Sequence, residues 1–491
     1  TPSNSSAASD VYKRQLYDPP KMKIALSKKN LWDRTPPFLK STLGMGLGLV
    51  PRRWLFGRSF SANCEFAREA QWWPSERVRE YQVKKLREIL TLGYECTRYY
   101  RSAFESAGFH PGDFRSTDDI SRLPTIDKSV VLENLSRMCA QNPAARGVEG
   151  VSTAGTSGAP FHFYTRVDRS ATEYSYLVAG WERVGYKLET PMAVLRGRAV
   201  RPERNGFRHE YDPVFRHHHY SSLHMSDENL GRYLDHIAGI GPCYLHVYPS
   251  TVMALARFIL RAGITAPKNV RGILTESEIV YPEQRELVEK VFGCRCFSSY
   301  GQTEKVVLAA GCEHSDDYHV WPTYGYFELL DDDDNPVTTP GRRGEIVGTG
   351  FINTVMPFIR YRTGDKATYV GNRCEACGRE HILIRDIRGH RTQEVLIAAD
   401  NSEIPWTAVN MHDDTFINVR QFQFLQEEPG QAVLRIVPAG GFGEDDVARI
   451  QRNLSRKFDN RLAFTVELTD AIPLSTRGKA VYVDQRIQRE A

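Results

Sequence analysis

Short apolar runs alternate with segments of helical periodicity from about residue 148 to residue 370, and this alternation constrains the fold more than any other feature of the sequence. The apolar runs are Met192–Leu195, Tyr244–Tyr248, Val270–Leu274 and Cys296–Ser299, and the helical segments between them are Thr251–Ala262 and Pro282–Phe292. Such alternation is typical of α/β folds whose strands are largely parallel. In open sheets of this kind, ligands bind at the carboxyl ends of the strands. The sequence therefore predicts an α/β fold with a ligand site at that edge.

The two ends of the chain differ from this central part. Residues 72–110 carry apolar residues at helical spacing. Beyond about residue 392, the strands Gln421–Gln426, Ala432–Val437 and Phe464–Leu468 accompany the amphipathic helix Asp445–Phe458, which predicts a small α+β module.

Length and these patterns together predict the domain organisation. A chain of 491 residues is too long for one compact core. The first residues are rich in Ser, Ala and Asn and do not begin with Met. We predict a flexible or non-native tail at 1–21, a large N-terminal domain at 22–390 and a C-terminal domain at 391–491.

Charge and cysteine usage narrow the class of protein. The 64 basic and 60 acidic residues give a net charge of +4, which argues against a dedicated nucleic-acid binder. No apolar run is long enough for a membrane span. Nine cysteines that form no regular disulfide framework, and no credible signal peptide, favour the cytoplasm. The sequence does not determine the oligomeric state, and a homodimer is one option.

A loop rich in Gly, Ser and Thr is the first of four short motifs. Its sequence is Ser152-Thr-Ala-Gly-Thr-Ser-Gly-Ala-Pro160. Glycines let the backbone approach anionic oxygens, and hydroxyl and N–H groups can then solvate phosphate. The Gly-Lys-Ser/Thr ending of a Walker loop is absent. The alternative interpretation is an ordinary Gly/Ser turn.

The second motif, Tyr300-Gly-Gln-Thr-Glu304, follows an apolar strand. Tyr300 can stack on a purine, Thr303 can reach a phosphate, and Glu304 can hold the hard cation Mg²⁺. The alternative is a helix start at which Glu304 favours the helix dipole.

The third motif, Tyr361-Arg-Thr-Gly-Asp365, also ends in a Gly turn. Its Asp365 carboxylate can accept both hydroxyls of a ribose, whereas an Asx-type turn is the structural alternative.

The fourth motif, Arg477-Gly-Lys479, lies close to the end of the sequence. A lysine ammonium is a compact charge that can neutralise a developing phosphate charge. A solvated surface lysine is the alternative.

A group of cysteines has the spacing of a metal site. Cys374-Glu-Ala-Cys377-Gly is a knuckle, and Cys312 and His319 precede it, which gives a Cys₃His set for zinc. His314 is an alternative fourth ligand, and free thiols are the alternative to zinc. A structural rather than catalytic role is expected for the metal.

The motifs, in this order, resemble the adenylate-forming superfamily and, within it, the phenylacetate–CoA ligase family. The resemblance covers roughly residues 60–491 and implies a large N-terminal adenylation domain, of several sheets, with a small mobile C-terminal lid. It implies ATP, Mg²⁺ and CoA as partners and Lys479, Glu304 and Thr303 as catalytic residues. It assigns nucleotide binding to Thr153, Gly155, Thr156, Ser157, Gly158, Tyr300, Gly301, Asp365 and Arg391. Ala154 and Phe161 depart from the family pattern and weaken the phosphate contacts without removing the loop.

Two further regions refine the resemblance. Gln393-Glu394 replaces an acidic pair of the family and resembles a branch associated with capsular polysaccharide synthesis, with the pivot of the lid near Gln393. Tyr248, Pro249 and Ser250 fall where family members place the acyl substrate. The histidine run His217–His219 is either an exposed loop or a sign of a polar substrate.

The resemblance thus predicts an enzyme that activates a carboxylic acid as an acyl-AMP and transfers the acyl group to CoA. Transfer to an amine or hydroxyl in surface-polysaccharide synthesis is one alternative. A nucleotide-binding pathway protein without catalysis is the other.

Overall fold

The computed structural model describes residues 58–141, 147–153, 161–198, 200–389, 394–409, 411, 415–416, 418–472 and 481–487. The predicted tail 1–21 and the predicted boundary between residues 390 and 391 lie outside these ranges. Among the described residues, no helix has both the length and the apolar composition that crossing a bilayer requires.

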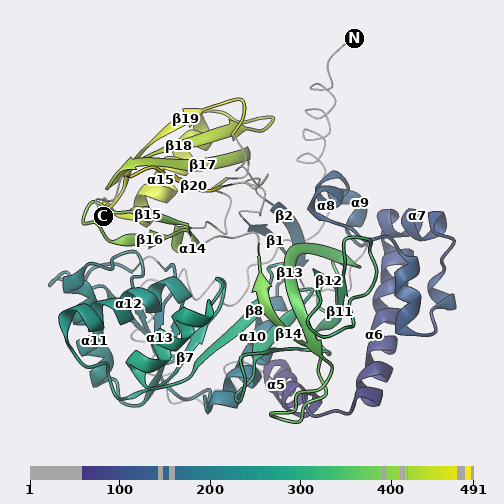
Figure 1. Ribbon diagram of the computed structural model, residues 1–491. Helices are drawn as coiled ribbons and strands as arrows, with labels where there is room; N and C mark the ends of the chain where they lie inside the picture. The colour runs from purple at the N-terminus through teal and green to yellow at the C-terminus, as the bar shows by residue number, and fades with distance from the viewer. Residues whose placement is uncertain are drawn as a thin grey trace.

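A large sheet forms the centre of the fold (Figure 1). Its strands are β3 Met192–Leu195, β4 His209–Asp212, β5 His217–Tyr220, β6 Cys243–Val247, β7 Val270–Thr275, β8 Cys296–Gly301, β9 Leu308–Gly311, β10 Tyr318–Val320, β11 Gly325–Leu330, β12 Arg343–Gly350, β13 Tyr361–Gly371 and β14 Leu383–Arg388. They lie in the order β11-β12-β13-β14-β10-β9-β8-β7-β6-β3-β5-β4. The run β5-β3-β6-β7-β8 is parallel, and antiparallel strands flank it on both sides. The predicted α/β fold is confirmed.

Helices cover the parallel part of the sheet. They are α10 Arg169–Trp181, η3 Glu182–Val184, α11 Asp227–Gly239, α12 Pro249–Ala262 and α13 Pro282–Phe292. Pro249 and Pro282 each occupy a first helical turn, where the missing N–H is not needed. Gly263 and Gly293 end the same two helices in the left-handed conformation. The apolar faces of α11, α12 and α13 form one core with β3, β5, β6 and β7.

Helix α5 Arg58–Ala70 packs against α10. The following helices pack on the antiparallel side of the sheet, and Figure 1 shows α6 beside β11 and α7 beside α6. They are α6 Ser75–Cys96, α7 Arg98–Ser106, η1 Pro111–Asp113, η2 Thr117–Arg122, α8 Lys128–Glu133 and α9 Leu135–Met138. Two strands, β1 Val148–Thr153 and β2 Phe161–Arg166, form a separate antiparallel pair. Residues 72–110 are largely helical, as the sequence predicts.

The C-terminal part has its own sheets and its own core. The small sheet pairs β15 Val395–Ile397 with β16 Glu403–Pro405, and helix α14 Trp406–Val409 follows it. The larger sheet has the strand order β19-β18-β17-β20. Its strands are β17 Val419–Glu428, β18 Gln431–Pro438, β19 Ala463–Leu468 and β20 Val483–Gln485, and helix α15 Glu444–Phe458 accompanies them. Ile450, Leu454 and Phe458 are the buried apolar side chains of α15 and point into this core. The predicted α+β module is therefore present. Its apolar cluster also includes Leu223 and Tyr248 from the central part.

Candidate functional site

Tyr300 and Asp365 meet at the carboxyl end of strand β8. The Tyr300 hydroxyl donates a hydrogen bond of 2.8 Å to Asp365 Oδ2. Burial and the neighbouring Asp365 charge raise the pKa of Tyr300 well above its ordinary value, so the phenol keeps its proton and remains a donor. In the sheet, three strands separate β8 from β13, yet the ends of the two predicted nucleotide motifs are brought into contact.

Tyr361 and Glu304 make a second contact between the same two motifs. The Tyr361 hydroxyl donates to Glu304 Oε1 at 3.0 Å. Burial and the Glu304 carboxylate raise the pKa of Tyr361 well above its ordinary value. The Phe161 ring lies parallel to the Tyr361 ring, with 6.5 Å between centroids. Two phenols thus hold the two carboxylates to which the sequence analysis assigned ribose and Mg²⁺.

Backbone and side-chain contacts fix the loops that carry these carboxylates. Gln302 donates to the Tyr300 hydroxyl at 2.7 Å and accepts from the Val307 N–H at 3.2 Å. The Asp365 N–H donates to Thr363 Oγ1 at 3.1 Å, which is the contact expected of an Asx/ST-type turn. Gly364 has a φ of 75°, in the left-handed region that a glycine adopts without strain. The structural alternative for this motif and its proposed ligand role are therefore compatible.

Ion pairs that the sequence did not single out surround Thr303 and Glu304. Arg169 on α10 donates to the Thr303 carbonyl at 3.4 Å and pairs with Glu149 on β1 at 2.8 Å. Lys305 pairs with Glu173, also on α10. These charges link α10 and β1 to the Tyr300–Glu304 motif. In the sequence these four charged residues resemble ordinary surface residues, and only the fold shows that they lie close together.

Several predicted site residues lie outside the described part of the chain. They are Gly155, Thr156, Ser157 and Gly158 of the phosphate loop, Arg391 near the pivot, and Lys479. Thr153 ends strand β1, and Gly301 ends strand β8. The roles of all these residues stay predictions.

Glu394, the second residue of the substituted acidic pair, has a clear structural position. Its carboxylate oxygen Oε2 accepts hydrogen bonds of 2.7 Å from the N–H groups of both Tyr482 and Val483. Glu394 thereby fixes the start of strand β20 within the C-terminal part.

The predicted acyl residues lie at the junction of β6 and α12. Tyr248 is buried, and Pro249 opens the helix. Ser250 donates through both its N–H and its hydroxyl to the Glu278 carboxylate, at 2.8 and 2.9 Å. The Arg196 guanidinium lies 5.1 Å from the centre of the Tyr248 ring, close enough for a cation–π contact.

A charged network that includes Arg196 lies next to Tyr248. Arg196 and His246 both contact Glu276 Oε1, and the nitrogens Arg196 Nη1 and His246 Nε2 lie 2.9 Å apart. Burial alone would raise the pKa of Glu276, but Arg196 and His246 lower it well below its usual value. The Arg196 charge is therefore balanced by an ionised Glu276. The sequence analysis did not single out His246 or Glu276.

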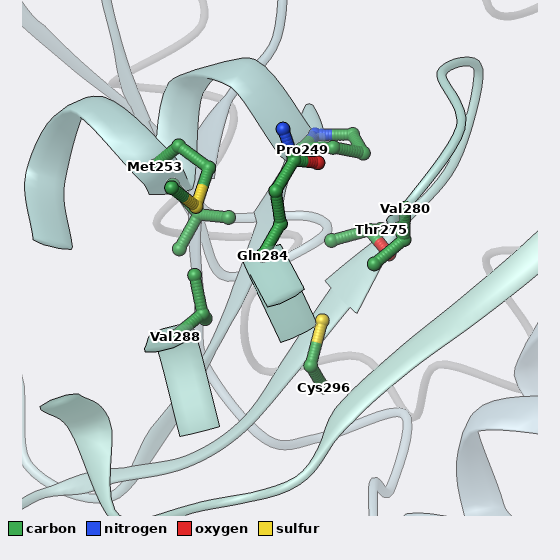
Figure 2. A pocket seen from close by; sticks show the side chains of 8 residues that line it. Pro249, Met253, Thr275, Val280, Gln284, Val288 and Cys296 are labelled. Atoms are coloured by element: carbon green, nitrogen blue, oxygen red, sulfur yellow. The ribbon is translucent and has the colours of Figure 1, made fainter. Parts of the chain in front are cut away.

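A small cavity lies behind this wall, between α12, α13 and β7. Figure 2 shows Pro249, Met253, Thr275, Gln284 and Val288 around it. The cavity has room for about one water molecule, which is too little for an acyl group.

The histidine run does not form an exposed loop. His217–Tyr220 is strand β5, the second strand from one edge of the large sheet, and its three histidines are half-buried.

The four predicted zinc ligands come together from three segments. Cys312 Sγ and Cys374 Sγ lie 3.9 Å apart, and Cys377 Sγ lies 3.6 Å from His319 Nε2. Tetrahedral zinc with ordinary bond lengths places two sulfurs about 3.8 Å apart and a sulfur and a nitrogen about 3.6 Å apart. His314 instead approaches Cys312 Sγ with its backbone N–H, at 3.4 Å. The geometry fits zinc and favours His319 over His314.

Comparison with known proteins identifies relatives of the chain. No family model matches it. The phenylacetate–coenzyme A ligase of Thermus thermophilus is 23% identical over 348 residues, which cover 66% of this chain and 72% of that protein. Protein CapK of Staphylococcus aureus is 22% identical over 376 residues, which cover 75% of this chain and 81% of CapK. An open conformation of 2-hydroxyisobutyryl-CoA ligase, solved with 2-HIB-AMP and CoA, aligns with a TM-score of 0.52 at 18% identity, covering 84% of this chain and 94% of that one.

The fold is that of the adenylate-forming ligases. In sequence, the chain is similar to phenylacetate–coenzyme A ligases and to CapK, at 22–26% identity.

Proposed function

We propose that the protein activates a carboxylic acid with ATP and transfers the acyl group to the thiol of CoA. The observation that carries this proposal is the pair of phenol–carboxylate contacts, Tyr300 with Asp365 and Tyr361 with Glu304. Each contact joins one residue from each of the two predicted nucleotide motifs. The paired residues lie 65 positions apart in sequence in the first contact and 57 in the second.

Each group of the site has a role in this proposal. Asp365 accepts the ribose hydroxyls, and Tyr300 lies against the adenine. Glu304 holds Mg²⁺, a cation that prefers carboxylate oxygens and substrate phosphates and would neutralise phosphate charge when bound. Thr303 and Lys479 bind the α-phosphate, and Arg391 contacts ribose or phosphate. The loop that contains Thr153, Gly155, Thr156, Ser157 and Gly158 covers the outer phosphates.

The reaction has two balanced steps. A carboxylate oxygen of the acid attacks the α-phosphorus of ATP, the bond to the β-phosphate oxygen breaks, and pyrophosphate leaves. Lys479 and Glu304 stabilise the charge that accumulates, Glu304 by holding Mg²⁺ when the cation is bound. The C-terminal part then rotates near Gln393. The thiol loses its proton and attacks the acyl carbon, and AMP leaves.

The wall around Tyr248 suggests the class of acid. Arg196 contacts the Tyr248 ring, but Glu276 already balances its charge. A second carboxylate on the substrate would meet no uncompensated positive charge from Arg196. The arrangement thus disfavours a second carboxylate on the tail of the acid.

A second acceptor is worth testing because the alignment with CapK covers more of this chain than the alignment with the Thermus thermophilus ligase does. In this alternative, the acyl-AMP passes to an amine or a hydroxyl instead of the CoA thiol. Both alternatives share the first step.

The test is ATP–pyrophosphate exchange with the purified protein over a panel of aryl, fatty and hydroxy acids, repeated with CoA and with amine or hydroxyl acceptors. Acid-dependent exchange supports adenylation, and the acceptor that releases AMP identifies the second step. Asp365→Asn should abolish exchange, whereas Asp332→Asn should not, because Asp332 is a 93% exposed side chain that forms an ion pair with Lys366. Tight ATP binding without exchange for any acid would contradict the proposal and favour a nucleotide-binding protein without catalysis.

We also propose a structural zinc at Cys312, His319, Cys374 and Cys377. The sulfur–sulfur and sulfur–nitrogen distances support it. The metal content of the purified protein, compared with that of Cys374→Ser, tests it. A Cys374→Ser variant that contains as much zinc as the wild type would contradict the proposal.

A further inference from the structure

Three histidines from three separate elements form a second cluster, far in sequence from the cysteines. His209 lies on β4, His218 on β5 and His236 on α11, and one ring nitrogen of each lies within 4.8 Å of the others. The register of the β4–β5 pair places His209 opposite Tyr220 and Tyr211 opposite His218. His209 and His218 therefore share one face of the sheet, because side chains alternate along a strand.

We infer that His209, His218 and His236 form a binding site for Zn²⁺ at the edge of the large sheet. His209 Nε2 lies 3.1 Å from His218 Nδ1, and tetrahedral zinc holds two imidazole nitrogens about 3.3 Å apart. The ring centres of His209 and His236 are 4.4 Å apart, and those of His218 and His236 are 5.6 Å apart.

The outer contacts of the rings fit the same assignment. A histidine that binds a metal with one nitrogen usually directs its other nitrogen to a carboxylate or another acceptor. His236 Nδ1 lies 2.8 Å from the Tyr220 hydroxyl, which leaves its Nε2 for the ion. His209 Nδ1 lies 3.7 Å from Glu203 Oε1.

All three histidines are half-buried, so the fourth position around the ion is accessible to water or to a small ligand. The bound ion would tie the edge hairpin to α11.

This inference is independent of the proposed catalytic function, and it is tested by counting bound metal. Full-length protein is stripped with a chelator and titrated with Zn²⁺ against a chromophoric competitor. The double variant His209→Gln/His218→Gln should bind one equivalent fewer than the wild type. His217→Ala is the matched control, since His217 lies on the same strand but on its opposite face, and it should bind as the wild type does.

A second variant covers the case in which the double change disturbs the hairpin. His236→Gln removes a ligand from the helix alone and should weaken Zn²⁺ binding at this site at least about tenfold. Titration with Co²⁺ distinguishes this site from the cysteine site, because imidazole ligands give no thiolate charge-transfer absorption. Equal zinc stoichiometry and affinity in the wild type and both variants would overturn the assignment, as would an equal loss in His217→Ala.

Discussion

Breaking the ion pair between Glu328 and Arg360 should be among the most destabilising single changes near the site. Arg360 immediately precedes β13, and its guanidinium donates to both carboxylate oxygens of Glu328 at 3.2 and 2.9 Å. The two side chains are only 6% and 8% exposed. Arg360 also donates to the carbonyls of Ser121 and Leu123, so it joins the N-terminal helices to the sheet.

The expected magnitude follows from this burial. Burial raises the pKa of Glu328 even though the Arg360 guanidinium opposes the rise, so desolvation of the carboxylate is a large cost. The intact pair then contributes little net stability, but removing one partner leaves a buried, uncompensated charge at a cost of about 3–5 kcal/mol. Glu328→Ala should lower the free energy of unfolding by that amount. Asp332→Asn, at the exposed Lys366 pair, should change it by about 0–1 kcal/mol.

Urea unfolding followed by circular dichroism measures both changes. The double variant Glu328→Leu/Arg360→Met should recover most of the loss, since apolar side chains of similar volume replace the whole pair. The reasoning fails if Glu328→Ala costs no more than Asp332→Asn, or if the double variant is less stable than Glu328→Ala.

Three further outcomes are expected. Burial, with a smaller effect of Lys128, lowers the pKa of His162 to about 4, below the ordinary histidine value of about 6.5. The unfolded chain therefore binds the extra proton, and stability should fall as pH decreases from about 6.5 to about 4, by at most about 1.4 kcal/mol per pH unit for this group. His162→Asn should flatten that slope in thermal melts across the pH range. Gly325→Ala should be strongly destabilising, because its new Cβ would clash with the Val306 carbonyl oxygen. Gly150→Ala should be mild, because no atom of the described residues lies within 4 Å of the new Cβ at that position. Soluble yield and melting temperature compare the two variants. Phe458→Ala removes a fully buried ring of α15 and should cost about 3–5 kcal/mol, and an unchanged melting profile would contradict the described C-terminal core.

The sequence predicted those elements whose local signals agree with their tertiary environment. Helix α13 begins and ends where the sequence predicts because Pro282 and Gly293 mark its two ends. The central parallel strands are buried on both faces, so they appear as continuous apolar runs. Strand β5 was not predicted, since a histidine run at the margin of the sheet has no apolar alternation to reveal it.

The site was predictable as motifs but not as contacts. Tyr300 and Asp365 belong to strands separated by three others, and their meeting depends on how the sheet curves. Likewise, the sequence contains no local signal that pairs Arg196 with Glu276, because residues 80 positions apart are brought together only by the order of the parallel strands. Cysteine spacing, in contrast, is a local signal, and it led directly to Cys374 and Cys377.

Tyr248, one of the residues predicted to contact the acyl group, is also a member of the apolar cluster of the C-terminal part. Under the proposed function, one ring therefore serves both the acyl site and a contact between distant segments of the chain. A substitution at Tyr248 that changed the acyl site would then also alter how the C-terminal part packs on the remainder. Under that proposal, substrate range and the packing of the C-terminal part would change together at this position.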